Sequence, residues 1–359
     1  MPISIGNISL YMGPHTAGAP DNLEEVIVDF IDGAKKSLDV AVQELESEPI
    51  ARALVKARQR GVKIRIVLEG DYLIADRAVS DPFDMEQMEA HDPNRTLIAA
   101  LWRAKIDVRT DYNPYIFHQK FIVRDFDGDA RLLTGSTNFT PTGTHKNLNH
   151  VAIFDHKNVA REYMEEFEEI WSGTFGEKRN RHERHPSQPR VSDVSLRINF
   201  APDHMPEMEI MKQMLKARQR IDFAIFTFAQ SSGIDDTMIA LSRAGLSVRG
   251  IADSAQGNQD WAASRPLHES GVDFYLAKKN SADFGKLHHK LMVIDEQVVI
   301  IGSFNYTNPA TMVNDENIIV IGDLDETRPE GIENQKKLGA YALDEINRII
   351  DRHGQKLAD

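Results

Sequence analysis

One polar pattern occurs twice in this chain, in the same order and with nearly the same spacing. The copies are His118-x-Lys120-x4-Asp125 with Gly135-Ser136-x-Asn138, and His288-x-Lys290-x4-Asp295 with Gly302-Ser303-x-Asn305. A polar residue follows each asparagine at the same interval, Asn149 in the first copy and Glu316 in the second. A repeat of this detail indicates an internal duplication, so the chain is expected to fold into two related halves.

The flanking sequence repeats in the same way, with helices and apolar strands alternating before each polar pattern. We expect helices at 23–34, 49–60, 97–104 and 159–171, and again at 208–217, 234–243, 259–270 and 335–350. We expect strands at 38–42, 62–68, 106–109, 121–123 and 151–154, and again at 221–228, 246–252, 272–276, 291–294 and 318–321. This alternation predicts two α/β domains, each with a mixed, mostly parallel sheet flanked by helices.

The length of 359 residues fits two domains of roughly 150 residues each. We expect an N-terminal domain at 1–176, a basic linker at 177–194 and a C-terminal domain at 195–359. The linker is either a solvated connection or a flexible contact for a polyanion, and its basic residues are Lys178, Arg179, Arg181, Arg184 and Arg190. A polar insertion at 75–94 either covers the site or only decorates the surface.

The composition of the chain limits which catalytic groups and which partners it can have. The chain has no cysteine, which excludes a thiolate nucleophile and a cysteine metal site. Its net charge of −13 argues against a protein that coats nucleic acid non-specifically, although a local basic groove stays compatible with it. The first 19 residues lack a secretion signal, and no segment approaches the roughly 20 apolar residues of a membrane span, so we expect a cytoplasmic protein without stable membrane insertion.

The repeated residues have the chemistry of a phosphate site. Strand alternation places each histidine on the same face as its lysine, His118 with Lys120 and His288 with Lys290. The lysines supply positive charge, Asn138 and Asn305 supply neutral donors, and Ser136 and Ser303 bind phosphate or orient a neighbour. Two histidines can cleave a phosphodiester in two steps without a metal or cofactor, one as nucleophile and the other as general acid and base.

The aspartates of the pattern have a different expected role. Asp125 and Asp295 fall five positions after the lysines, which is the opposite face of an ideal strand. We therefore expect them to anchor local structure, and we group them with Gly135 and Gly302 as structural members of the pattern.

The two patterns resemble the signature of the phospholipase D superfamily, and the similarity extends from about Leu10 to Ile350. This resemblance implies two pseudo-twofold-related domains, one active site at their interface, and metal-independent cleavage through a phosphohistidine. In that family the position occupied here by Glu316 or Asn149 is commonly an acidic or amide residue that hydrogen-bonds a catalytic histidine of the opposite half. The resemblance thus implies that Glu316 contacts His118, as the nucleophile, and that Asn149 contacts His288, as the general acid and base, with reversed roles if each contact lies within one half.

Three segments, 47–51, 56–67 and 108–111, are similar to the small bacterial nuclease branch of the superfamily. Those nucleases carry one pattern per chain and dimerise, whereas this chain is expected to complete its site alone. A nucleic acid, either DNA or RNA, is therefore the expected substrate. Phospholipid or another small phosphodiester is the alternative, and a non-catalytic nucleic-acid-binding descendant is the second alternative.

Overall fold

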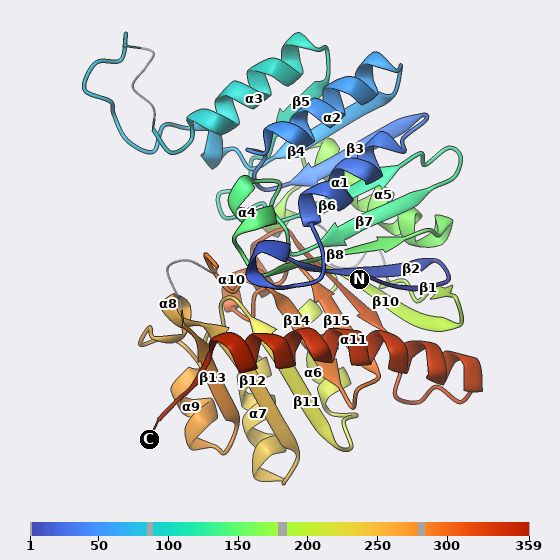
Figure 1. Ribbon diagram of the computed structural model, residues 1–359, viewed down its shortest axis with the longest axis vertical. Helices are drawn as coiled ribbons and strands as arrows, with labels where there is room; N and C mark the ends of the chain where they lie inside the picture. Colours follow the sequence, from blue (N-terminus) through green and yellow to red (C-terminus); the bar gives the residue numbers. More distant parts are fainter. Residues whose placement is uncertain (1, 85–88, 179–184, 279–283, 359) are drawn as a thin grey trace.

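The computed structural model describes residues 2–84, 89–178, 185–278 and 284–358, which form two sheets, one from each half of the chain (Figure 1). The first sheet has the order β1-β2-β8-β7-β6-β3-β4-β5. Its strands are β1 (Ile3–Ile5), β2 (Ile8–Gly13), β3 (Ser37–Val42), β4 (Lys63–Leu68), β5 (Asp107–Thr110), β6 (Lys120–Arg124), β7 (Arg131–Gly135) and β8 (Asn149–Phe154).

The second sheet has the order β17-β13-β12-β11-β14-β15-β16-β10-β9. Its strands are β9 (Arg190–Val191), β10 (Val194–Ala201), β11 (Arg220–Ile225), β12 (Ser247–Asp253), β13 (Asp273–Ala277), β14 (Lys290–Ile294), β15 (Val298–Gly302), β16 (Glu316–Ile321) and β17 (Gly354–Lys356). The strand after each repeated histidine has equivalent neighbours, because β6 lies between β3 and β7, and β14 lies between β11 and β15. The predicted duplication of an α/β unit is therefore confirmed.

The sheets are mixed, as predicted, but the expectation that they are mostly parallel is wrong. Among the strands of the described residues, parallel pairs occur only within β3-β4-β5 in the first sheet and β11-β12-β13 in the second. The remaining neighbours pair antiparallel. Parallel pairs require a crossover, which α2 and α3 supply between β3, β4 and β5, whereas β6 and β7 are joined by a short turn.

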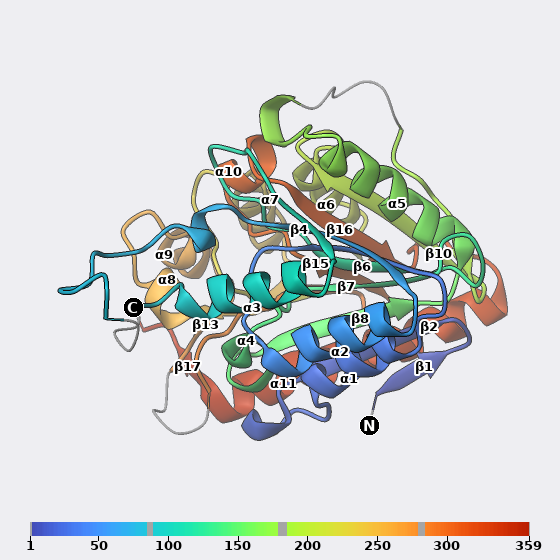
Figure 2. The ribbon, with the colours of Figure 1, turned by 90° about the horizontal axis from the view of Figure 1, so that it is seen from above.

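Helices cover the sheets in layers (Figures 1 and 2). The helices are α1 (Leu23–Asp32), α2 (Glu48–Gln59), α3 (Asp92–Arg103), α4 (Pro141–His145), α5 (Lys157–Trp171), α6 (Pro206–Met214), α7 (Gly233–Arg243), α8 (Ser254–Gly257), α9 (Ser264–Glu269), α10 (Asn308–Met312) and α11 (Pro329–His353). One apolar cluster joins α1, α2 and α3 to the first sheet, and another joins α6, α7 and α9 to the second. The largest cluster contains α5, α11 and strands of both sheets, so a shared core holds the halves together.

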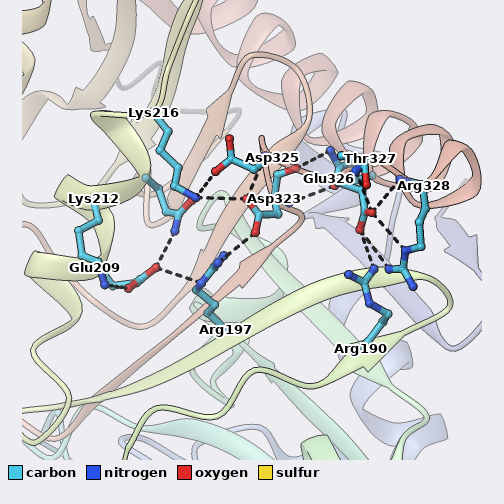
Figure 3. Close-up of polar contacts among 12 residues, drawn as sticks. Arg190, Arg197, Glu209, Lys212, Lys216, Asp323, Asp325, Glu326, Thr327 and Arg328 are labelled. Carbon is cyan, nitrogen blue, oxygen red and sulfur yellow. Dashed lines mark hydrogen bonds and ion pairs between the residues drawn. The ribbon is translucent and has the colours of Figure 1, made fainter.

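The predicted linker is partly absorbed into the second sheet. Its residues 179–184, with Arg179, Arg181 and Arg184, lie outside the described residues. Arg190 belongs to β9, which pairs with β10, so the second sheet begins before the predicted end of the linker. Arg190 also forms a 2.7 Å ion pair with Glu326, within a charged network around the segment that follows β16 (Figure 3). Arg190 is thus engaged in an intramolecular contact.

The predicted insertion at 75–94 lies in the same half as α3, and its residues 85–88 fall outside the described residues. Its described N-terminal part extends away from the two sheets in both ribbon views. Helix α3 starts at Asp92, five residues earlier than predicted, with Asp92 and Glu89 both contacting Arg95. The covering role of this insertion stays a prediction.

Candidate active site

The two repeated histidines meet in one pocket between the halves. Their ring centroids lie 6.5 Å apart, with the rings inclined at 71°. His118 and His288 are 6% and 8% exposed, and both line a pocket of about 620 Å³. Because each histidine comes from a different half, the tertiary structure joins the two patterns into a single site.

Backbone contacts between the halves place each histidine. The His118 N–H donates to the carbonyl of Asp315 at 3.0 Å, and Asp315 N–H donates to Ile116 at 3.1 Å. In the other half, the His288 N–H donates to the carbonyl of Leu148 at 2.9 Å. Asp315 directly precedes Glu316, and Leu148 directly precedes Asn149. The segment before each histidine is thus paired with the segment before its partner residue in the opposite half.

The side-chain contacts also run crosswise, as the family resemblance implies. His118 Nδ1 lies 2.7 Å from Glu316 Oε2, and His288 Nδ1 lies 2.9 Å from Asn149 Oδ1. Both partner residues are fully buried. Each histidine ring is therefore oriented by the other half of the chain, which leaves Nε2 as the ring nitrogen available to a ligand.

The hydrogen bonds of Asn149 determine the tautomer of His288. Asn149 Nδ2 donates to the Gly143 carbonyl at 2.9 Å, so Oδ1 is the atom that faces His288, and it must accept a proton carried on Nδ1. Ser303 Oγ donates to the Glu316 oxygen that contacts His118, at 2.6 Å, which favours a carboxylate acceptor there. The neutral form of either imidazole then has its lone pair on Nε2.

The serines of the pattern do not contact the pocket. Ser136 and Ser303 are fully buried, and their hydroxyls donate to Asn149 Oδ1 and Glu316 Oε2. Of the two roles predicted from sequence, the geometry provides orientation of a neighbour and not phosphate binding. The reason is that each serine follows a glycine at which the chain leaves the sheet, so its side chain points back toward the next strand.

The lysines are buried beside the histidines. Lys120 Nζ donates to Gln43 Oε1 at 3.0 Å and to the His118 carbonyl at 2.7 Å. Lys290 Nζ donates to the His288 carbonyl at 2.9 Å. An ammonium group has three donors, so each lysine retains donor capacity beyond these bonds.

Asn138 and Asn305 line the pocket. Among the described residues, the Oδ1 atoms of both amides have no hydrogen-bond partner. Asn138 Nδ2 is 3.4 Å from Gln43 Oε1. Buried amides with unused polar atoms are suited to binding a polar ligand.

The glycine of each pattern permits close approach of two strands. Gly135 has φ +153° and Gly302 has φ +148°. A Cβ atom would lie 2.3 Å from the His150 carbonyl oxygen at the first position and 2.2 Å from that of Asn317 at the second. Side chains are therefore excluded at both positions, since the strand that carries Asn149 or Glu316 passes directly beside them.

The two aspartates lie away from the pocket and hold the loop before a neighbouring strand. Asp125 accepts hydrogen bonds from the backbone N–H groups of residues 35, 36 and 37, which lead into β3. Asp295 accepts from those of residues 218, 219 and 220, which lead into β11. Both contacts are of the anchoring kind expected from their strand positions.

Sequence reasoning missed a second pair of carboxylates. Glu69 accepts from the Phe117 N–H at 2.6 Å, and Asp253 accepts from the Leu287 N–H at 3.1 Å. Each of these N–H groups belongs to the residue directly before His118 or His288. A signal was present, because one acidic residue directly follows β4 and another ends its counterpart β12.

A buried histidine pair was also missed. His150 and His289 directly follow Asn149 and His288, and their rings stack at 5.4 Å with Nδ1 atoms 3.1 Å apart. Gln119 and Asn317 occupy the corresponding positions of the other halves and share a 2.6 Å hydrogen bond. Each of these two pairs therefore forms a buried contact between the two halves of the chain.

Burial shifts every charged group of the site toward its neutral form. It lowers the pKa of His118 and of His288, and the lysine ammonium groups lower both further. It lowers the pKa of Lys120 to about 7 and that of Lys290 well below its usual range. It raises the pKa of Glu316 to about 8. A bound phosphate would favour the charged lysines again.

The described residues contain no group of three or more His, Asp, Glu or Cys side chains arranged to hold a metal ion. None of their helices combines the length and apolar character needed to cross a membrane.

A family model described as the PLD-like domain of cardiolipin synthase matches residues 27–171 and 210–329. The chain is 30% identical over 158 residues to mitochondrial cardiolipin hydrolase of Homo sapiens, covering 44% of this chain and 53% of that protein. It is 30% identical over 146 residues to phospholipase D of Rickettsia felis, covering 41% of this chain and 62% of that protein. These matches therefore span little more than half of each relative.

Phosphatidylserine synthase of Haemophilus influenzae shares the fold of nearly the whole chain. Its structure aligns with a TM-score of 0.67 at 14% identity, covering 99% of this chain and 89% of that one. The family model matches one segment in each half, and together the segments contain both copies of the pattern. The chain belongs to the phospholipase D superfamily.

Proposed function

We propose that this chain is a metal-independent phosphodiesterase that acts through a phosphohistidine on His118, with nucleic acid as its substrate. The two imidazoles support this proposal most directly. The Nδ1 atom of each ring contacts a side chain of the opposite half, and both rings line one pocket. The transition state of phosphoryl transfer requires hydrogen-bond donors around the phosphate. Near the two histidines these donors come from Lys120, Lys290, Asn138 and Asn305.

In the first step, His118 Nε2 attacks phosphorus, and the bond to the leaving oxygen breaks as His288 Nε2–H protonates that oxygen. In the second step, neutral His288 removes a proton from water, the water oxygen attacks phosphorus, and the nitrogen–phosphorus bond breaks. Glu316 suits His118 to the nucleophilic role, because the ring gains positive charge as it is phosphorylated and this charge favours the ionised carboxylate beside it. The neutral amide of Asn149 leaves the His288 imidazolium a stronger acid.

The lining of the pocket favours nucleic acid over lipid. It consists mainly of amide, hydroxyl and aromatic side chains, with few aliphatic groups such as Ile116. Such a surface suits sugars, phosphates and bases better than acyl chains. Phospholipid is the second candidate, because relatives at 30% identity include proteins named cardiolipin hydrolase and phospholipase D.

The test incubates the purified chain with single-stranded DNA, duplex DNA, RNA and cardiolipin or phosphatidylcholine vesicles, each in excess chelator. We expect cleavage of at least one nucleic acid and no cleavage of the vesicles. Cleavage of lipid alone would overturn the proposed substrate, and loss of all activity on adding chelator would overturn the metal-independent mechanism.

The phosphohistidine has its own test. Rapid mixing with labelled substrate, followed by an alkaline quench, should trap a phosphoenzyme in the wild type but not in His118→Asn. Label on His288 instead of His118 would reverse the two roles.

A further inference from the structure

The pocket walls contributed by the two halves differ in charge. Apart from the two histidines, the charged side chains that line the pocket in the described part of the chain are Glu44 on the N-terminal wall and Lys286 on the C-terminal wall. Residues at equivalent positions of the two halves show this difference in charge directly. Lys286 precedes His288 by two residues, where Ile116 precedes His118, and Thr227 follows β11 where Glu44 follows β3.

The aromatic groups are also distributed unequally, with Tyr72 on the N-terminal wall and both Phe226 and Trp261 on the C-terminal wall. The Phe226 ring lies 4.9 Å from the His288 ring, and Lys286 Nζ lies 5.6 Å from the centroid of Phe226. The counterpart of Phe226 is Gln43, because the N–H of each donates to the residue after the catalytic histidine of its half. Trp261 lines the same C-terminal wall and is 45% exposed. The side of the pocket next to His288 thus combines two aromatic rings with a cation.

These features fit the part of a nucleic-acid strand that lies on one side of the cleaved phosphodiester bond. Aromatic rings stack on bases with little regard to sequence, and a lysine neutralises a phosphate. The opposite wall carries Glu44, which disfavours a second phosphate there. The leaving oxygen receives its proton from His288 in the mechanism proposed above, so the leaving group lies on the aromatic and cationic side.

We propose that Trp261, Phe226 and Lys286 form a subsite for the leaving nucleotide of a single strand, with its base against Trp261 and its next phosphate on Lys286. This inference rests on the proposed function, from which it takes the role of His288. It adds a direction to the cleft, since the strand continues past the C-terminal wall and not past Glu44.

The experiment compares two variants with a matched control. Trp261→Ala removes the proposed stacking ring, and Lys286→Ile copies the counterpart Ile116. Trp102→Ala removes a tryptophan that is 53% exposed and does not line this pocket. Affinity for a fluorescent single-stranded DNA is measured in the His118→Asn background, which prevents cleavage. Turnover of the same DNA and of bis(4-nitrophenyl) phosphate is measured with His118 intact.

We expect Trp261→Ala to weaken DNA binding about 5- to 150-fold, since base stacking contributes about 1–3 kcal/mol per base. Its kcat/KM should fall more for DNA than for the small diester, which has no next nucleotide. Lys286→Ile should reduce the slope of log affinity against log salt by about 0.7, the value for one phosphate contact on a single strand. Trp102→Ala should match the parent protein in each measurement.

The subsite is overturned if Trp261→Ala binds DNA like Trp102→Ala, or if Lys286→Ile keeps the parental salt slope. Equal losses on DNA and the small diester also overturn it, because they indicate a disturbed catalytic centre. Failure of the proposed function is a separate result. It is a wild type that cleaves neither diester, and the binding comparison still decides the subsite in that case.

Discussion

At the scale of single residues, the difference between the two histidines lies in what holds their Nδ1 atoms. A carboxylate contacts His118 and an amide contacts His288, although the two positions are equivalent in the duplicated pattern. Charge on the first imidazole is therefore stabilised more than charge on the second. One difference between the two copies of the repeat is enough to give the rings different electrostatic surroundings.

The buried lysines predict how anion binding depends on pH. Burial lowers the pKa of Lys120 to about 7, so this ammonium is lost as pH rises above 7. Bound anion favours the charged form, and affinity therefore decreases on the alkaline side. Sulfate affinity, measured by calorimetry, should fall by up to about tenfold per pH unit between pH 7 and 9. Lys120→Arg should show a shallower decrease, and a wild-type affinity that is constant over this range would contradict the prediction.

At the scale of elements, the ends of β4 and β12 determine where each histidine lies. Glu69 and Asp253 occupy these ends and accept the N–H that precedes His118 or His288. The next residue of each segment is His118 or His288, and its backbone N–H donates to the carbonyl of Asp315 or Leu148 in the opposite half. Each catalytic segment is thus held by a carboxylate of its own half and by the backbone of the other half.

Replacing Glu69 by alanine should affect both stability and catalysis. The Phe117 N–H would be left buried without its acceptor, at a cost of about 1–3 kcal/mol in the free energy of unfolding. His118 would also lose its position, so kcat should decrease more than KM changes. Glu69→Gln retains an acceptor oxygen and should keep most of both properties. Urea unfolding and steady-state kinetics test this, and equal effects of the two substitutions would exclude a positioning role for the carbonyl oxygen.

At the scale of the whole molecule, the two halves share one core and one site, and their interface has two versions of the same contact. One version is the stacked pair His150 and His289, with His289 Nε2 3.2 Å from Glu345. The other is the pair Asn317 and Gln119, whose Nε2 donates to Glu166 at 3.1 Å. The same geometry is therefore built once with titratable groups and once without them.

This difference predicts sensitivity to acid. Burial lowers the pKa of His150 and of His289, so below about pH 6.5 the unfolded chain binds protons that the folded pair does not. Stability is accordingly lost as pH falls below 6.5, by up to about 1.4 kcal/mol per pH unit for each histidine. The double variant His150→Asn with His289→Gln copies the other contact and should retain the fold with a smaller loss.

Melting temperatures from pH 7.5 to 5 provide the measurement. The catalytic histidines contribute to the loss in both proteins, so the double variant should flatten the curve without abolishing its slope. His15→Gln, at an exposed histidine, is the control and should leave the slope unchanged. Parallel curves for wild type and double variant would show that the pair does not limit acid stability.

Much of the fold was predictable, because the signals are local. Apolar runs and helical periodicity located β3, β4, β6, α1, α2 and α5 and their counterparts to within a few residues. Strands β2 and β10, each of which lies beside an outermost strand of its sheet, were missed, and the proportion of parallel strands was overestimated. Both depend on which strands become neighbours, which short-range patterns do not specify.

The sequence by itself determined that the chain is duplicated, that each half contributes one histidine and one lysine, and that the aspartates lie on another face of their strands. These conclusions follow from residue type, spacing and the alternation of side chains along a strand. The tertiary structure alone decided that the serines orient Asn149 and Glu316, that Glu69 and Asp253 hold the catalytic segments, and that the two pocket walls differ in charge. Each of these depends on contacts between residues far apart in the chain, which form only when the two sheets pack around one core.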